Sequence, residues 1–110
     1  MCWFEAGLTD SFWGAGYQPL QCLGLLPGGC GVHYHSDGER KPRLMAAIEA
    51  GAIPPSVAID DFAAVLYENE TAVHTVSWAP GASAYDIGLH DGRATETPRE
   101  CEQISLSVGE

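Results

Sequence analysis

The chain has 110 residues, of which 45% are hydrophobic, and it carries a net charge of -10. This length allows one domain at most, and the acidity excludes a nucleic-acid-binding protein, because a phosphate backbone needs a basic face. No apolar run approaches the roughly 20 residues that span a bilayer, and the start of the chain lacks the features of a signal peptide. The four cysteines form no Cys-x-x-Cys motif, so we expect reduced thiols and a cytoplasmic protein.

The first predicted element is the tail of a helix over residues 1–7, which Gly7 ends. Residues 20–26 then predict an apolar strand that runs into a glycine-rich loop, and His33 lies on that loop. Glycine lets a backbone approach a ligand closely, and loops at strand ends often carry catalytic groups. His33 is therefore the first candidate for a functional residue.

A helix is predicted between Asp37 and Gly51. Asp37 can cap its start, and Pro42 suits a first helical turn. Apolar residues recur at helical spacing until Gly51 ends the pattern. These apolar residues are Leu44, Met45 and Ile48.

The second half of the chain has β-strand patterns. Residues 57–59 predict a buried strand that ends at Asp60 and Asp61. Two hairpins follow, one turning at Glu68-Asn69-Glu70 and one at Asp91-Gly92. Their strands are expected at residues 63–67 and 71–77, and at residues 85–90 and 93–97. Residues 98–110 predict a flexible tail, so residues 1–110 hold a single domain or part of one.

Hydrolysis by a triad requires a nucleophile, a histidine that takes its proton and an acid that orients the histidine. Among the four histidines, His33 is the best placed. His35 points to the opposite side if the local chain is extended. His74, in a hairpin strand, and His90, beside a turn, are expected at the surface.

The acid has two candidates, and the nucleophile has none that satisfies the usual pattern. Asp10 follows the first predicted helix, and Asp61 follows the buried strand. No Gly-x-Ser-x-Gly elbow occurs in the chain, and Ser83, the nearest approach to one, precedes no helix.

A metal site is the competing interpretation of the same glycine-rich stretch. Cys30, His33, His35 and Asp37 are all metal-ligand types, and they lie close together in the sequence. Structural zinc sites usually draw on two spaced pairs, and no second pair exists here. We therefore expect no metal and no other cofactor.

Two segments resemble the peptidase E family of aspartyl dipeptidases. Residues 31–34, Gly-Val-His-Tyr, followed by residues 37–40, Asp-Gly-Glu-Arg, resemble its histidine segment, with Val32 in place of the usual proline. Residues 2–11 resemble the segment that follows its nucleophile elbow. Residues 58–61 and 81–85 resemble its acidic strand end and its closing hairpin element.

The resemblance implies an α/β fold related to class I glutamine amidotransferases. The chain would be the C-terminal half of a three-layer sandwich with a mostly parallel central sheet, starting just after the nucleophilic serine. His33 would be the general base, and the acid would be Asp10 or the Asp60-Asp61 pair. We favour Asp61, because a strand end holds a side chain more rigidly than a loop.

The implied function is serine-type hydrolysis of Asp-X dipeptides or similar small peptides, without nucleic acid or membrane as partner. Arg40 or Arg43 would hold a substrate carboxylate through a bidentate contact. One alternative is an inactive remnant that binds another chain or self-associates through exposed sheet edges. Another is an amidotransferase-like relative in which Cys2 is the nucleophile.

Overall fold

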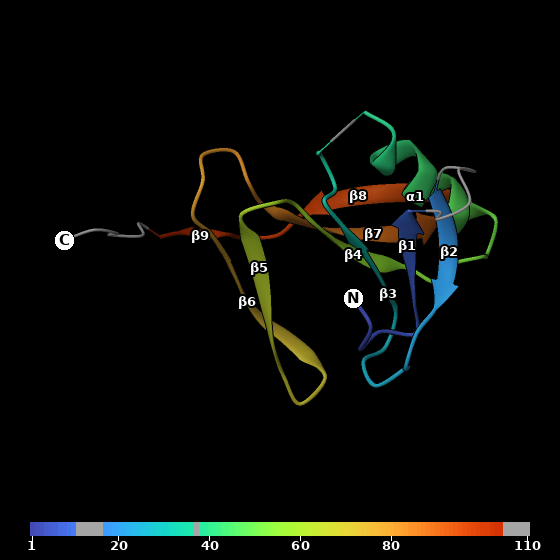
Figure 1. The fold of residues 1–110 in the computed structure, drawn as a ribbon, viewed down its shortest axis with the longest axis horizontal. Helices are drawn as coiled ribbons and strands as arrows, with labels where there is room; N and C mark the ends of the chain where they lie inside the picture. Colours follow the sequence, from blue (N-terminus) through green and yellow to red (C-terminus); the bar gives the residue numbers. More distant parts are fainter. Residues whose placement is uncertain (11–16, 37, 105–110) are drawn as a thin grey trace.

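The computed structural model describes residues 1–10, 17–36 and 38–104. These residues form a six-stranded sheet, a three-stranded sheet and one helix (Figure 1). The larger sheet has, in spatial order, β2 (Tyr17–Gln21), β1 (Ala6–Asp10), β3 (Gly29–Val32), β4 (Ser56–Ile59), β7 (Ala84–His90) and β8 (Arg93–Pro98). The smaller sheet has β5 (Ala63–Glu68), β6 (Thr71–Ser77) and β9 (Glu102–Gln103). None of the described helical residues forms a segment long and apolar enough to cross a membrane.

Residues 1–5 form turns and β1 begins at Ala6, so the helix expected over residues 1–7 is wrong. Ala6 and Leu8 are buried in β1, which lies between β2 and β3 in the larger sheet. Gly7 lies inside this strand, where a Cβ atom would lie 3.0 Å from the Cys30 carbonyl oxygen on β3. The hydrogen bonds that β1 makes with strands on both of its sides outweigh the helical preference predicted from the local sequence.

The glycine-rich stretch itself forms the strand that precedes His33. The strand expected at residues 20–26 is wrong: β2 ends at Gln21, and β3 begins at Gly29. A Cβ atom at Gly29 would lie 2.7 Å from Ile53 Cγ2, and one at Gly31 would lie 2.6 Å from Leu44 Cδ2. These glycines therefore allow neighbouring side chains to pack closely against β3, and they do not form the loop that the sequence predicted.

The single described helix, α1 (Arg40–Glu49), covers one face of the larger sheet. Its residue Ile48 is fully buried in the main core, with Leu44 beside it. Gly51 ends the helix with a φ of +80°, as predicted. The N-cap residue is Glu39, which makes no side-chain capping hydrogen bond, and the predicted cap Asp37 lies outside the described residues.

The strand and hairpins of the second half are confirmed. β4 is buried as expected, and the β7–β8 turn places Asp91 and Gly92 at φ values of +53° and +77°, as a type I′ turn requires. The tail expected from residue 98 is wrong in part. β8 continues to Pro98, and β9 pairs in parallel with β6, while residues 105–110 lie outside the described part of the chain.

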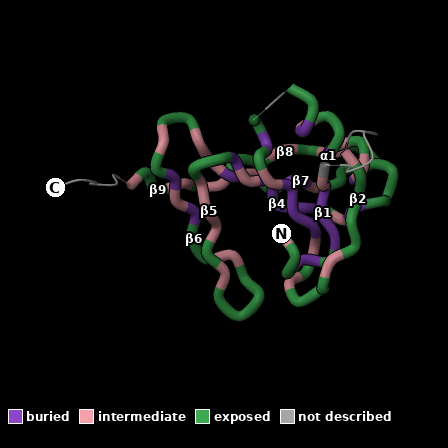
Figure 2. The backbone as a smooth tube through the Cα atoms, in the orientation of Figure 1, coloured by how far each residue is buried: buried purple, intermediate pink, exposed green. Residues whose placement is uncertain are grey.

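The fold is of the α/β type, with a mixed larger sheet. Pairings β1–β3 and β3–β4 are parallel, whereas β1–β2, β4–β7 and β7–β8 are antiparallel. The expected mostly parallel sheet is thus not what the described residues form, because three of its five pairings are antiparallel. Burial is concentrated in the larger sheet, and the β5–β6 hairpin projects from it with an exposed tip (Figure 2).

Candidate active site

The predicted histidine and acids stand at or directly after the carboxyl ends of three neighbouring strands of the larger sheet. β1, β3 and β4 run parallel, with Leu8 opposite Gly31 and Val32 opposite Ile59. His33 follows β3 directly, Asp60 and Asp61 follow β4, and Asp10 is the last residue of β1. The carboxyl ends of parallel strands are where α/β sheets usually bind their ligands.

His33 and Asp61 contact each other through side chains that are both open to solvent. Nδ1 of His33 is hydrogen-bonded to Oδ1 of Asp61, and the two side chains are 55% and 43% exposed. His33 has a φ of +53°, a left-handed conformation that histidine adopts more readily than most residues. Nε2 has no hydrogen-bond partner among the described residues, so it is the nitrogen that can take a proton.

The neighbouring pair joins an exposed histidine, His35, to a buried carboxylate, Asp60. Oδ1 of Asp60 lies 2.8 Å from Nδ1 of His35, and its Oδ2 accepts the backbone N–H of Ser83 at 3.0 Å. The Asp60 side chain is only 7% exposed. The two histidines therefore engage different carboxylates, and Asp60 contacts His35 rather than His33.

A buried tyrosine supports the turn that carries both histidines. The Tyr34 hydroxyl donates to Oε1 of Glu96 on β8 at 2.5 Å, and the Lys41 ammonium lies 3.0 Å from the same oxygen. Burial and this hydrogen bond raise the pKa of Tyr34 well above its usual range. Burial alone would raise the pKa of Glu96, but the hydrogen bonds from Tyr34 and Lys41 lower it instead. No sequence signal links Tyr34 with Glu96, which are far apart in the chain.

The two arginines expected to bind a substrate carboxylate lie in different surroundings. Arg40 is 8% exposed, and its guanidinium lies 4.7 Å from the centre of the Tyr17 ring and donates to the Val32 carbonyl at 3.3 Å. It thus holds the end of β3, which does not favour the expected role in substrate binding. Arg43 is exposed on α1.

The other candidate nucleophiles and ligands do not join His33. Cys2 precedes β1, whose start lies beside the start of β3, so it is at the opposite end of that strand from His33. Cys30 is buried, and burial raises the pKa of its thiol to about 11. Ser83 is engaged with Asp60 through its backbone. No group of three or more metal-ligating side chains lies together in the described part of the chain.

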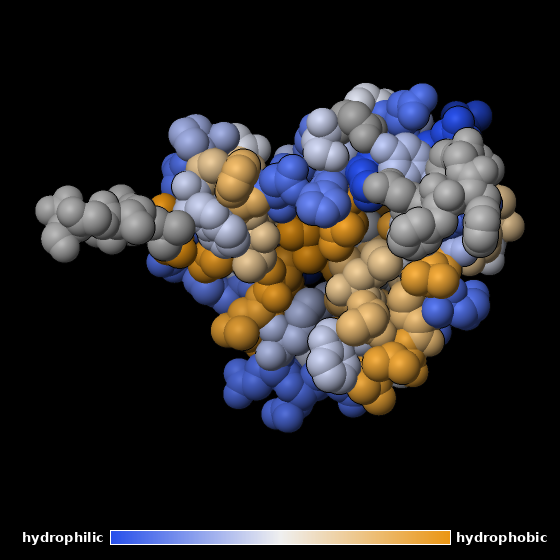
Figure 3. Space-filling view, in the orientation of Figure 1, coloured by the Kyte–Doolittle hydropathy of each residue, from blue (hydrophilic) through white to orange (hydrophobic). Residues whose placement is uncertain are grey.

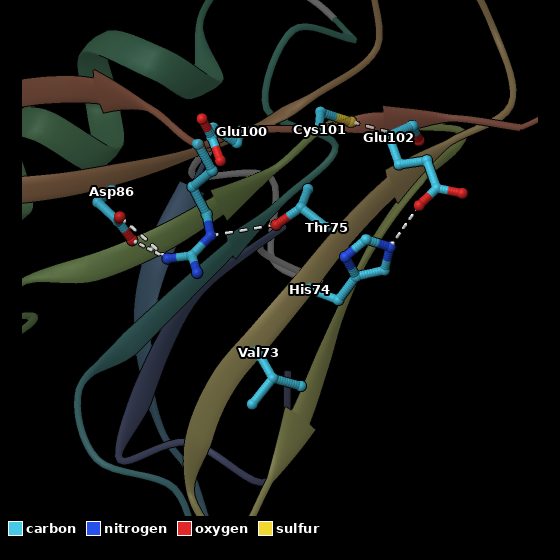
Figure 4. Close-up of a pocket in the computed structure, with 8 residues that line it drawn as sticks. Val73, His74, Thr75, Asp86, Glu100, Cys101 and Glu102 are labelled. Atoms are coloured by element: carbon cyan, nitrogen blue, oxygen red, sulfur yellow. Dashed lines mark hydrogen bonds and ion pairs between the residues drawn. The ribbon is translucent and has the colours of Figure 1, made fainter.

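A separate cavity of about 740 Å³ lies between β6, β7 and the segment that leads into β9 (Figure 4). Its lining residues pair with one another. Nη1 of Arg99 lies 2.8 and 2.9 Å from the two Asp86 oxygens, and Nε donates to Thr75 Oγ1 at 3.1 Å. His74 Nε2 lies 3.0 Å from Oε1 of Glu102. These contacts fasten the end of the described chain to β6 and β7.

Comparisons with known proteins agree on one family. The sequence model described as Peptidase family S51 matches residues 1–75, which include His33 and Asp61. A Bacillus subtilis (strain 168) protein named "Uncharacterized peptidase YgaJ" is 35% identical over 99 residues, which are 89% of this chain and 42% of that protein. The chain thus spans about two fifths of the length of this relative. No solved structure matches the chain.

Proposed function

This chain belongs to peptidase family S51, and on that premise we propose that it supplies the base and the acid of a serine peptidase that hydrolyses small peptides. The single observation that carries this proposal is the exposed His33–Asp61 pair. An exposed imidazole whose Nδ1 is held by a carboxylate presents Nε2 in the orientation that a general base needs.

In the proposed reaction, a serine hydroxyl attacks the scissile carbonyl carbon while Nε2 of His33 accepts the hydroxyl proton. Asp61 keeps the proton of the neutral imidazole on Nδ1 and stabilises the imidazolium that forms. His33 then returns the proton to the leaving amine, and water releases the acyl group by the reverse sequence. Asp61 remains ionised throughout.

The serine is proposed to come from the part of the family's fold that lies outside this chain. Among the described residues, no serine, threonine or cysteine side chain hydrogen-bonds to the His33 ring. The chain would then form the C-terminal part of a three-layer sandwich, with α1 as one outer layer. By itself it is expected to hydrolyse no peptide, because a triad without its nucleophile retains little rate.

Asp10 is the alternative acid. It ends β1, the parallel neighbour of β3 on the side away from β4, so it stands one strand from His33 as Asp60 and Asp61 do. Asp61 is favoured because its contact with His33 is already made. Replacing Asp10 or Asp61 by alanine in the hydrolysis assay described below distinguishes the two assignments. Loss of the acid of the triad should lower kcat/KM nearly as much as loss of the histidine does.

The test is dipeptide hydrolysis by this chain joined to the upstream segment that completes the length of an S51 peptidase. His33→Ala should lower kcat/KM by about a thousandfold or more. His74→Ala is the matched control, since it also removes a histidine paired with a carboxylate, on the smaller sheet, and it should lower kcat/KM by less than about tenfold. Full activity of His33→Ala would overturn the proposal.

Self-association is a second candidate, favoured by the exposed apolar surface. Trp3, Leu23 and Leu25 are all more than half exposed on neighbouring turns, and apolar side chains also gather over the β5–β6 hairpin (Figure 3). The edges of the larger sheet, β2 and β8, are open to pairing in the described residues. Size-exclusion chromatography of the purified chain tests this candidate, and a stable monomer would contradict it.

A further inference from the structure

His33 keeps a left-handed backbone on the segment that leads from β3 to α1 (Figure 1). Its φ of +53° lies in a region that residues other than glycine seldom occupy, and such a conformation persists where neighbouring contacts hold it. The value of φ also sets the direction in which the Cβ atom leaves the backbone. The contact between Nδ1 of His33 and Asp61 therefore depends on the groups that hold this turn.

The two peptide groups that flank His33 are fixed by neighbours in the fold. The Val32 carbonyl, in the peptide group before His33, accepts a hydrogen bond from Nη1 of Arg40 at 3.3 Å. The Tyr34 N–H, in the peptide group after His33, donates to the carbonyl of Ile59, the last residue of β4, at 3.1 Å. This second bond ties the His33 backbone to the strand that carries the acid.

Ser36 makes two further hydrogen bonds to the peptide group that follows His33. The His33 carbonyl accepts the Ser36 N–H at 3.1 Å and the Ser36 hydroxyl at 2.9 Å. The N–H bond closes the turn, and any residue except proline could make it. The hydroxyl bond requires serine or threonine, and it stabilises the same orientation of the carbonyl. Ser36 is itself exposed, so its side chain is not needed to fill the core.

We propose that Ser36 is a positioning residue for the His33–Asp61 pair. Its hydroxyl holds the His33 carbonyl, and thereby the left-handed backbone, so that Nδ1 stays on Asp61 and Nε2 stays open to the proton of the attacking serine. Ser36 acts through His33 and takes no part in the proton transfer, because its hydroxyl donates to a backbone carbonyl. The inference rests on the proposed peptidase function and extends it beyond the residues of the triad.

The tautomer of the His33 ring tests the positioning role in the 110-residue chain without any hydrolysis. In Ser36→Ala, the loss of one hydrogen bond should lower the ratio of Nδ1-protonated to Nε2-protonated imidazole at His33 by about threefold or more, as read from nitrogen-15 NMR. Ser36→Thr, which keeps the hydroxyl, should restore the parent ratio.

Ser56→Ala is the matched control for this measurement. The Ser56 hydroxyl, at the start of β4, also donates to a backbone carbonyl, that of Pro54, at 2.7 Å. Its removal should leave the tautomer ratio of His33 unchanged. An unchanged ratio in Ser36→Ala, or an equal fall in Ser56→Ala, would overturn the proposal.

Dipeptide hydrolysis by the chain joined to its upstream segment separates positioning from substrate contact. Ser36→Ala should lower kcat by about threefold to tenfold and leave KM within about twofold of the parent value, because a misplaced base slows the chemical step without weakening binding. Ser36→Thr should recover the parent kcat, and Ser56→Ala should keep it. A raised KM at unchanged kcat would place Ser36 against the substrate and overturn the positioning role. Failure of the peptidase proposal would appear instead as full hydrolysis by His33→Ala.

Discussion

Asp60 and Asp61 are neighbours at the end of β4, yet their side chains differ in exposure and in partner. Asp60 is 7% exposed and bonds His35 and the Ser83 amide, whereas Asp61 is 43% exposed and, among the described residues, bonds His33. Asp60 ties the segment after β3 and the end of β4 to the start of β7, and the His33–Asp61 pair is open to solvent. A carboxylate that the fold holds in place keeps its neighbour at the strand end in a fixed position.

The largest expected difference between the two aspartates is in stability. Asp60→Ala should lower the free energy of unfolding by about 2–3 kcal/mol, because it leaves the Ser83 amide without its acceptor. Asp61→Ala should cost less than about 1 kcal/mol, since its ion pair is exposed. Urea unfolding monitored by circular dichroism measures both. Equal losses of unfolding free energy for the two variants would contradict the different structural roles assigned to Asp60 and Asp61.

A smaller effect is expected at high pH from the tyrosine beneath the two histidines. The pKa of Tyr34 is raised in the folded chain, so the unfolded chain loses its proton first. The contribution of Tyr34 to the unfolding free energy should therefore be constant below about pH 10 and fall above it, by up to about 1.4 kcal/mol per pH unit. Tyr34→Phe should flatten this slope.

Tyr85→Phe is the control for that measurement. The pKa of Tyr85 is also raised, mainly by burial, but its hydroxyl is not hydrogen-bonded to Glu96. Its removal should flatten the alkaline slope less than Tyr34→Phe does. If the two variants have the same slope, the Tyr34–Glu96 bond is not what supports the turn at residues 33–36.

The smallest expected effects concern the two arginines of α1, of which Arg40 is buried and Arg43 is exposed. Arg40→Ala should cost about 1–2 kcal/mol of unfolding free energy, because Arg40 holds the Val32 carbonyl and packs on Tyr17. Arg43→Ala should change it by less than about 0.5 kcal/mol, as is usual for an exposed residue. A larger loss for Arg43→Ala than for Arg40→Ala in thermal unfolding would contradict this assignment.

Much of the second half of the fold could be predicted from local sequence. The turn residues Asp91 and Gly92 set a hairpin by their own conformational preferences, and the short apolar run at residues 57–59 could pack only as a buried strand. The first half could not be predicted in this way. Gly29 and Gly31 are glycines because Ile53 and Leu44 occupy the space of a side chain, and those neighbours are distant in the sequence.

The residues of the candidate site could be predicted from the sequence, but not which of them contact each other. His33 and the acids at the ends of β1 and β4 were identified because they follow predicted strands or match segments of the family. Which aspartate meets which histidine depends on the left-handed turn at His33, which no residue type in that stretch requires. Glu96 was missed, because its importance arises from a contact that only the folded chain defines.

The most direct test of the exposed pair is the tautomer of its imidazole, read from nitrogen-15 NMR of the histidine rings at a pH where they are neutral. We expect His33 to carry its proton on Nδ1, facing Asp61, and to present Nε2 as the base. Asp61→Asn should abolish this preference at His33 and leave the His35 ring, which bonds Asp60, unchanged. A His33 ring protonated on Nε2 in the parent chain would contradict its assignment as the general base.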